Sequence, residues 1–219
     1  TFDATIKVEH LVDHADLLER LAAANLLFVV SAFESVDPAT IAILDKGHTV
    51  HDMVQAVDLV RRAGIYLRPT WLPFFPWTEP GDVADIFEFL DENDLVPATD
   101  PVQLAIKLLV PRGSLLEAHP ALFPHLKGYD EAALTWRWDF ADGATAVLYE
   151  QLQTIAADAS DCGQEIAVTL NQMREVVGLV SRRTLPPLVI DHEVPRLTES
   201  WYCCAEPTRG QAVSVSIGR

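Results

Sequence analysis

The sequence predicts an α/β fold built on a parallel sheet, and three observations support that prediction. Apolar runs of strand length alternate with segments of helical periodicity through the first half of the chain. Residues 26–30 are apolar without alternation, which is typical of a parallel strand covered on both faces. Helix signals separate the runs, with Asp37-Pro38 as a start and Gly64 as a stop. Alternating strands and helices imply a parallel sheet with right-handed crossovers.

The pattern places three βα units and a fourth strand in the first half of the chain. Residues 5–11 alternate and are rich in β-formers, so they are predicted to form the first strand, with an exposed edge. The other predicted elements follow from apolar runs and from periodicity near 3.6. They are strands at 28–35, 65–72 and 102–110, and helices at 16–24, 38–45, 51–63 and 80–93.

The second half of the chain changes character. Residues 113–128 are rich in Leu, His and Pro and are predicted to connect, whereas 142–159 and 164–180 have helical periodicity and form a helix pair. Cys162 is predicted to be a surface thiol in the turn between these helices. Prolines from Pro186 onward block helix, so the last part is predicted to be an irregular arm.

Charge and composition narrow the partners. The chain has 32 acidic and 16 basic side chains, a formal net charge of −16. This charge repels nucleic-acid phosphates and anionic membranes, so neither is an expected partner. The chain contains no apolar run of membrane-spanning length, and its odd, low count of three cysteines suits a reducing cytoplasm. His10 and His14 lack the further ligands that a zinc site needs.

The most informative motif is Phe28-Val-Val-Ser-Ala-Phe-Glu-Ser35, followed by Asp37-Pro38 and Leu44-Asp-Lys-Gly-His-Thr49. It is a buried strand that ends in polar groups and leads into a capped helix. Such groups lie where α/β folds bind their ligands, at the carboxyl end of the strands. A purely structural interpretation stays open, in which Glu34 caps a helix and Lys46 is a solvated helix end.

This motif resembles the fourth strand and following helix of radical S-adenosylmethionine (SAM) enzymes. Residues 70–79, Thr-Trp-Leu-Pro-Phe-Phe-Pro-Trp-Thr-Glu, resemble that superfamily's fifth strand, with aromatic residues and Pro in place of its glycines. The tail Trp201-Tyr-Cys-Cys-Ala-Glu-Pro207 resembles the CUAEP/CCAEP-tail radical SAM (seleno)protein family. Some similar tails carry selenocysteine at the position of Cys204.

The resemblance implies the later βα units of a partial TIM-like barrel. Residues 1–128 would be the C-terminal half of that barrel, 129–183 a helical extension, and 184–219 the irregular arm with its Cys-Cys tail. Radical SAM chemistry requires a [4Fe-4S] cluster on a Cys-x3-Cys-x2-Cys loop, and Cys162, Cys203 and Cys204 do not have that spacing. The chain is therefore expected to be part of a longer enzyme, inactive alone, with the cluster ligands upstream.

The resemblance also implies roles for particular residues. Glu34 would accept hydrogen bonds from the SAM ribose, with Thr70 as a second ribose candidate, and Lys46 would pair with the SAM carboxylate. The other implied contacts are Lys7 and Glu9 near the methionine moiety and the backbone of Leu109 and Val110 beside the adenine. The substrate would be a small molecule or a peptide.

The adjacent pair Cys203 and Cys204 is predicted to be redox-active, because a vicinal disulfide is strained and easily reduced. Cys204 is expected to be the more reactive thiol. A different class of function stays open, namely a non-catalytic α/β binding or scaffold domain with a thiol redox tail. A cysteine loop preceding these residues would favour the enzyme over the scaffold.

Overall fold

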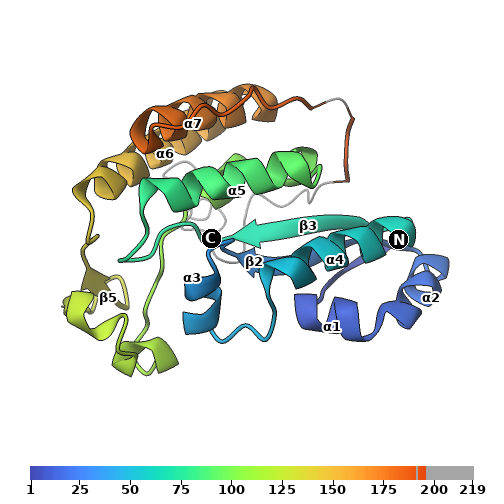
Figure 1. Ribbon diagram of the computed structural model, residues 1–219, viewed down its shortest axis with the longest axis horizontal. Helices are drawn as coiled ribbons and strands as arrows, with labels where there is room; N and C mark the ends of the chain where they lie inside the picture. Colours follow the sequence, from blue (N-terminus) through green and yellow to red (C-terminus); the bar gives the residue numbers. More distant parts are fainter. Residues whose placement is uncertain (191, 196–219) are drawn as a thin grey trace, which may run out of the picture.

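The computed structural model describes residues 1–190 and 192–195. Its centre is a parallel three-stranded sheet of order β1-β2-β3, shown in Figure 1. The strands are β1 (Phe2–Thr5), β2 (Leu26–Glu34) and β3 (Tyr66–Trp71). The predicted α/β class is confirmed, with an open sheet and no closed barrel in this part of the chain.

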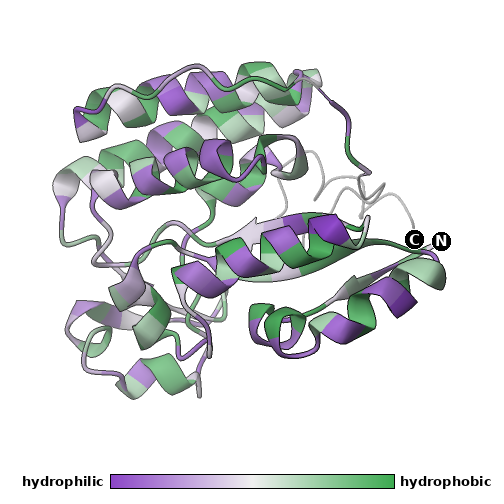
Figure 2. Ribbon diagram, turned by 45° about the vertical axis from the view of Figure 1, so that its right-hand side comes forward, coloured by the Kyte–Doolittle hydropathy of each residue, from purple (hydrophilic) through white to green (hydrophobic). Residues whose placement is uncertain are grey.

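Seven α-helices surround this sheet in the described residues, and Figure 2 shows that each mixes hydrophobic and hydrophilic residues. In Figure 1, α5 to α7 lie above the sheet and α1 to α4 below it. Short 3-10 turns connect several of them. The helix bounds are α1 (Val8–Asp13), α2 (Leu18–Ala23), α3 (Pro38–Ile43), α4 (Val50–Arg62), α5 (Pro80–Glu92), α6 (Gly143–Cys162) and α7 (Ile166–Ser181).

The predicted first strand at residues 5–11 is wrong. The strand ends at Thr5, and α1 begins at Val8. Val8 and Leu11 are three residues apart, so a helix buries both on one side, and both are almost fully buried in the main core. Lys7 and Glu9 therefore do not lie on a strand. Lys7 is the exposed N-cap residue of α1, and Glu9 lies in its first turn.

The predicted strand at residues 102–110 is also wrong. Pro101–Ala105 forms the 3-10 helix η3, and the following segment makes one isolated parallel bridge, between Phe74 and Lys107. The Gln103 side chain accepts the Trp71 backbone N–H at 3.2 Å. A side chain thus takes the place of a backbone ladder at the end of β3.

An antiparallel hairpin that the sequence analysis did not anticipate follows the connecting segment. It pairs β4 (Leu126–Asp130) with β5 (Thr135–Trp138). The hairpin and its neighbours build a small second core, because Phe75, Leu108, Val110 and Leu122 pack together. The 3-10 turns here and elsewhere are η1 (Ala15–Leu17), η2 (Val96–Ala98), η4 (Leu115–Ala118) and η5 (Phe123–His125).

The main core lies between the sheet and the helices. Phe33, Trp71 and Phe89 meet edge to face, with ring centroids 5.6 to 6.1 Å apart. Leu148, Leu170 and further residues of α6 and α7 join the same cluster. The sheet and the helix pair therefore share one continuous core in the described residues.

The predicted helix pair is present, and the predicted arm can be followed only in the described residues after α7. Cys162 is the exposed last residue of α6 rather than a turn residue, and Gly163 makes the turn with φ 66°. Residues 183–190 follow α7 without regular secondary structure. Within the described ranges, none of the helices combines the length and the apolarity needed to cross a bilayer.

Candidate ligand site at the carboxyl end of the sheet

The site begins with the backbone of Glu34, the last residue of β2. Glu34 has φ 66°, in the left-handed region that costs a non-glycine residue roughly 1 kcal/mol or more. The register of β2 and β3 shifts between Ala32 and Glu34, and the Leu72 N–H donates to the Glu34 carbonyl at 2.9 Å. Strained backbone of this kind is concentrated at functional sites.

An ion pair joins Glu34 to Lys46. The Lys46 Nζ donates to Glu34 Oε1 at 2.7 Å, and the two side chains are 27% and 17% exposed. The loop between α3 and α4 makes this possible, because left-handed Asp45 and Gly47 flank Lys46. The pair is the polar centre of the site, open enough for a ligand to reach.

Helix caps hold both ends of that loop. The Asp37 carboxylate accepts from the N–H groups of Ala39 and Thr40 at the start of α3. Thr49 and Asp52 form a reciprocal capping box at the start of α4. Asp37, and not Glu34, is thus the N-cap of α3, which removes the capping role considered for Glu34.

Glu9 reaches the same loop from α1. A Cβ added to Gly47 would lie 3.0 Å from Glu9 Oε2, so the carboxylate packs directly against the Gly47 backbone. Gly47 also has φ 74°. Two independent constraints therefore favour glycine between Lys46 and His48, and they bring a second carboxylate beside the Glu34 and Lys46 pair.

His48 is the buried titratable group of this site. Its side chain is 8% exposed, and its Nε2 has no hydrogen-bond partner in the described residues. Burial lowers the pKa of His48 below 6.5, and the nearby Lys46 charge lowers it further. The ring is thus neutral near pH 7, with one nitrogen left free to accept a hydrogen bond.

The remaining residues implied by the resemblance lie farther from this pair or are differently engaged. Thr70 is half-buried in β3 and is paired with Ala32. Leu109 is 43% exposed. The Val110 N–H donates to Thr135 Oγ1 at 2.9 Å, and its carbonyl accepts from Trp136 N at 2.8 Å, so the hairpin already uses this backbone.

The structure brings Glu34, Lys46 and Glu9 together, and it leaves Lys7 exposed at the N-cap of α1. Sequence reasoning assigned no role to Gly47 or His48, although both lie in the quoted motif. A signal was present, because a glycine between two polar residues in a short interhelical segment indicates a left-handed turn.

Of the three cysteines, Cys162 lies within the described residues. Cys203 and Cys204 lie outside the described residues. Among the described residues, no group of three or more His, Cys, Asp or Glu side chains could hold a metal ion. The residues on view therefore do not fit a [4Fe-4S] cluster.

Comparison with known proteins gives a fold relationship. No family model matches the chain, and no curated protein matches it in sequence. The cobalamin-dependent SAM radical enzyme OxsB with aqua-cobalamin bound is similar at TM-score 0.65 and 13% identity, over 82% of this chain and 34% of that one. OxsB with aqua-cobalamin and SAM bound gives TM-score 0.59 and 12% identity, over 73% and 29%.

The apo form of OxsB gives a similar result, with TM-score 0.64 and 13% identity over 82% of this chain and 34% of that one. The chain thus spans about a third of the length of the enzyme that it resembles. At this identity the similarity establishes the fold alone. The chain has the α/β arrangement of part of a radical SAM enzyme.

Proposed function

We propose that this chain is part of a radical SAM enzyme of the CUAEP/CCAEP-tail family and supplies the ribose-binding carboxylate of its SAM site. The observation that carries the proposal is the position of Glu34. This residue ends a parallel strand with a left-handed backbone, and its carboxylate is bound by Lys46 at 2.7 Å. This is the position at which α/β folds bind ligands.

The ion pair indicates which group of SAM each of the two side chains would bind. Lys46 bonds to Oε1 of Glu34, which leaves Oε2 to accept from a ribose hydroxyl. The ammonium has three donors, so it can hold Glu34 and bind the SAM carboxylate together. Lys46 thus keeps the Glu34 carboxylate oriented, while Glu34 limits the motion of the lysine.

The other residues complete the proposed site. Glu9, against Gly47, and Lys7 at the start of α1 would lie near the methionine moiety, and Thr70 would supply a hydroxyl to the ribose. Leu109 and Val110 would border the adenine. Because the Val110 N–H and carbonyl are both engaged by the hairpin, its contact with adenine would be one of packing.

SAM bound to an iron–sulfur cluster would supply the radical chemistry, and these residues would bind and orient it. The cluster ligands are proposed to come from outside this chain. Among the described residues, β1 pairs with β2 alone, so its other edge can accept the remaining barrel strands. On this proposal the chain is inactive alone, its substrate is a small molecule or a peptide, and it works in the cytoplasm.

The test is calorimetric titration of SAM into the intact enzyme carrying Glu34→Gln. The loss of one charged hydrogen bond, about 1.5 to 3 kcal/mol, corresponds to weaker binding by roughly tenfold to 150-fold. Glu131→Gln is the matched control, because Glu131 pairs with Arg112 at 2.8 Å on the open surface. Cluster content, measured as iron per chain, is expected to stay unchanged in both variants.

Unchanged SAM affinity in Glu34→Gln would refute the assignment. Absence of SAM binding by the intact wild-type protein would instead support the alternative, a non-catalytic α/β binding or scaffold domain with a thiol redox tail. The two outcomes are distinct because the first is a property of one residue and the second is a property of the whole protein.

A further inference from the structure

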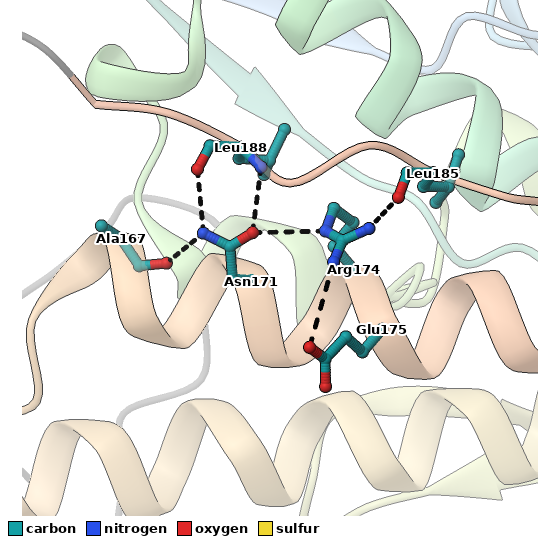
Figure 3. Close-up of polar contacts among 6 residues, drawn as sticks. All are labelled: Ala167, Asn171, Arg174, Glu175, Leu185 and Leu188. Carbon is teal, nitrogen blue, oxygen red and sulfur yellow. Dashed lines mark hydrogen bonds and ion pairs between the residues drawn. The ribbon is translucent and has the colours of Figure 1, made fainter.

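The segment that follows α7 is fixed to the helices by named contacts. The Asn171 amide donates to the Leu188 carbonyl at 3.0 Å and accepts from the Leu188 N–H at 2.9 Å, and Arg174 donates to the Leu185 carbonyl (Figure 3). Arg183 pairs with Asp85 and, at 3.7 Å, with Glu88 on α5. Side chains from two helices thus set the path of residues 183–190.

The path leads to the amino end of the sheet. His192 and Val194 line a cavity of about 310 Å³ together with Gly64 and Ile65, which precede β3. Arg68 of β3 then donates to the Pro195 carbonyl at 3.4 Å. The described chain therefore ends against the middle of a sheet strand and not in open solvent.

Arg68 identifies the face of the sheet that the chain has reached. It pairs in register with Val30, its guanidinium lies 5.5 Å from the Phe28 ring, and it forms a buried ion pair with Asp100. Strand alternation places Phe28, Val30 and Ala32 on this face and Val29 and Phe33 on the other. Val29 and Phe33 belong to the main core.

The apolar side chains of the Arg68 face stand outside both core clusters of the described part of the chain. Phe28, Val30 and Ala32 belong to neither of the two core clusters of the described residues. Phe28 is nonetheless 5% exposed. Three neighbouring apolar side chains on one face of a sheet form a surface that a further apolar segment can bind.

We propose that residues 196–219 of this chain dock on that face and bring Cys203 and Cys204 towards the ligand site. Trp201 and Tyr202 lie just beyond Pro195 and supply the large amphipathic surface that such a face binds. The sequence from 212 to 217, Ala-Val-Ser-Val-Ser-Ile, alternates with period two, as a segment with one buried face does.

The chain beyond Pro195 is long enough to bring Cys203 to the carboxyl end of the sheet. Cys203 is about eight residues beyond Pro195, which spans up to roughly 26 Å when extended. The level of Arg68 and Val30 is about four strand residues, or roughly 13 Å, from Glu34. A dithiol held on this face can therefore reach the carboxyl end of the sheet. The docking does not depend on SAM, so it stands or falls separately from the proposed ribose contact.

Crosslinking tests the docked position directly. In a Cys162→Ser background, Ala32→Cys places a thiol on the Arg68 face, and Thr154→Cys places one on the exposed surface of α6. With a short bis-maleimide at low protein concentration, the expected result is an intramolecular link from position 32 to Cys203 or Cys204 and none from position 154. Equal linking at both positions, or links only between two chains, would overturn the proposal.

Alkylation kinetics provide a second measurement without a change to the sheet. Cys162 is exposed and serves as the internal reference in the reduced wild-type chain. Docking is expected to slow the alkylation of Cys203 and Cys204, so the Asn171→Ala variant, which loses both bonds to Leu188, is expected to raise their rates at least tenfold relative to that of Cys162. If the rates of Cys203 and Cys204 relative to that of Cys162 are the same in the wild type and in Asn171→Ala, docking is contradicted.

Discussion

Phe33 and Glu34 are neighbours in β2, yet they belong to regions built on opposite principles. Phe33 lies under the helices in a cluster of edge-to-face aromatic rings and is fully buried. Glu34 lies at the carboxyl end of the sheet with a left-handed backbone, a charged partner and partial exposure. The first region packs apolar rings against the helices, whereas the second combines a left-handed backbone with charged side chains.

The difference separates stability from binding within one strand. The helix-covered face contains apolar and aromatic side chains that exclude water and contribute to the free energy of unfolding. The carboxyl end contains Glu34 with positive φ and His48 with an unpartnered Nε2, features that cost stability. Features that lower stability without improving the packing are expected at a ligand-binding site.

The largest effect is expected on the helix-covered face. Phe33→Ala removes a fully buried ring from the Trp71 and Phe89 cluster and is expected to lower the free energy of unfolding by about 3 to 5 kcal/mol. Phe123→Ala, at a ring that is 67% exposed, is the control and is expected to change it by less than about 0.5 kcal/mol. Urea denaturation measures both, and equal losses would contradict the comparison.

Gly47, at the carboxyl end of the sheet, can be compared with Gly64, which precedes β3 at the amino end. Gly47 (φ 74°) and Gly64 (φ 72°) share a left-handed backbone, so each replacement by Ala is expected to cost about 1 to 2 kcal/mol in urea denaturation. Only at Gly47 does the new Cβ meet Glu9, whereas nothing lies within 4 Å at Gly64. SAM affinity is therefore expected to fall in Gly47→Ala alone. A similar loss of affinity in Gly64→Ala would show that backbone strain, and not Glu9, is responsible.

The smallest effect is a pH dependence. The pKa of His48 is lowered in the folded protein, chiefly by burial, so the unfolded chain binds the proton first as the pH falls below about 6.5. The stability contributed by neutral His48 is present above that pH and is lost as the pH falls towards the lowered pKa. His48→Gln is expected to flatten the wild-type decline below about pH 6.5. The neighbouring exposed His51→Gln is expected to retain it, and an identical decline in all three proteins would contradict the role of burial.

Local signals predicted β2 and the two helices that follow it well. The continuous apolar run of β2, the Asp37-Pro38 start of α3 and Gly64 after α4 each have one dominant local meaning, and the structure follows them. The predicted arm after α7 also holds for residues 183–190. Predictions from strong helix caps and apolar runs hold because tertiary packing favours the same elements.

Predictions failed where tertiary contacts outweighed the local pattern. Residues 5–11 alternate, but packing of Val8 and Leu11 against the core selects a helix. Residues 102–110 have an apolar run of strand length, but Pro101 starts a 3-10 helix and Gln103 bonds to the end of β3. In both cases the contact that decides is distant in sequence, so periodicity could not reveal it.

The candidate site was predicted in part. The sequence indicated Glu34 and Lys46 as site residues, and the structure joins them. It did not indicate that Lys46 bonds to Glu34 itself, or that Glu9 packs on Gly47, because both contacts depend on the left-handed turn at residues 45–47. The roles proposed for Thr70, Lys7, Leu109 and Val110 stay predictions.

The most direct test compares Glu34→Gln with Phe33→Leu in the intact enzyme, with the SAM dissociation constant and the urea midpoint measured for each. Glu34→Gln is expected to weaken SAM binding at least tenfold while its midpoint stays close to the wild type, since its ion pair is partly exposed. Phe33→Leu is expected to lower the midpoint and leave the affinity unchanged. If both variants lose affinity in proportion to their loss of stability, the carboxyl end of β2 is not a separate binding region, and the account is contradicted.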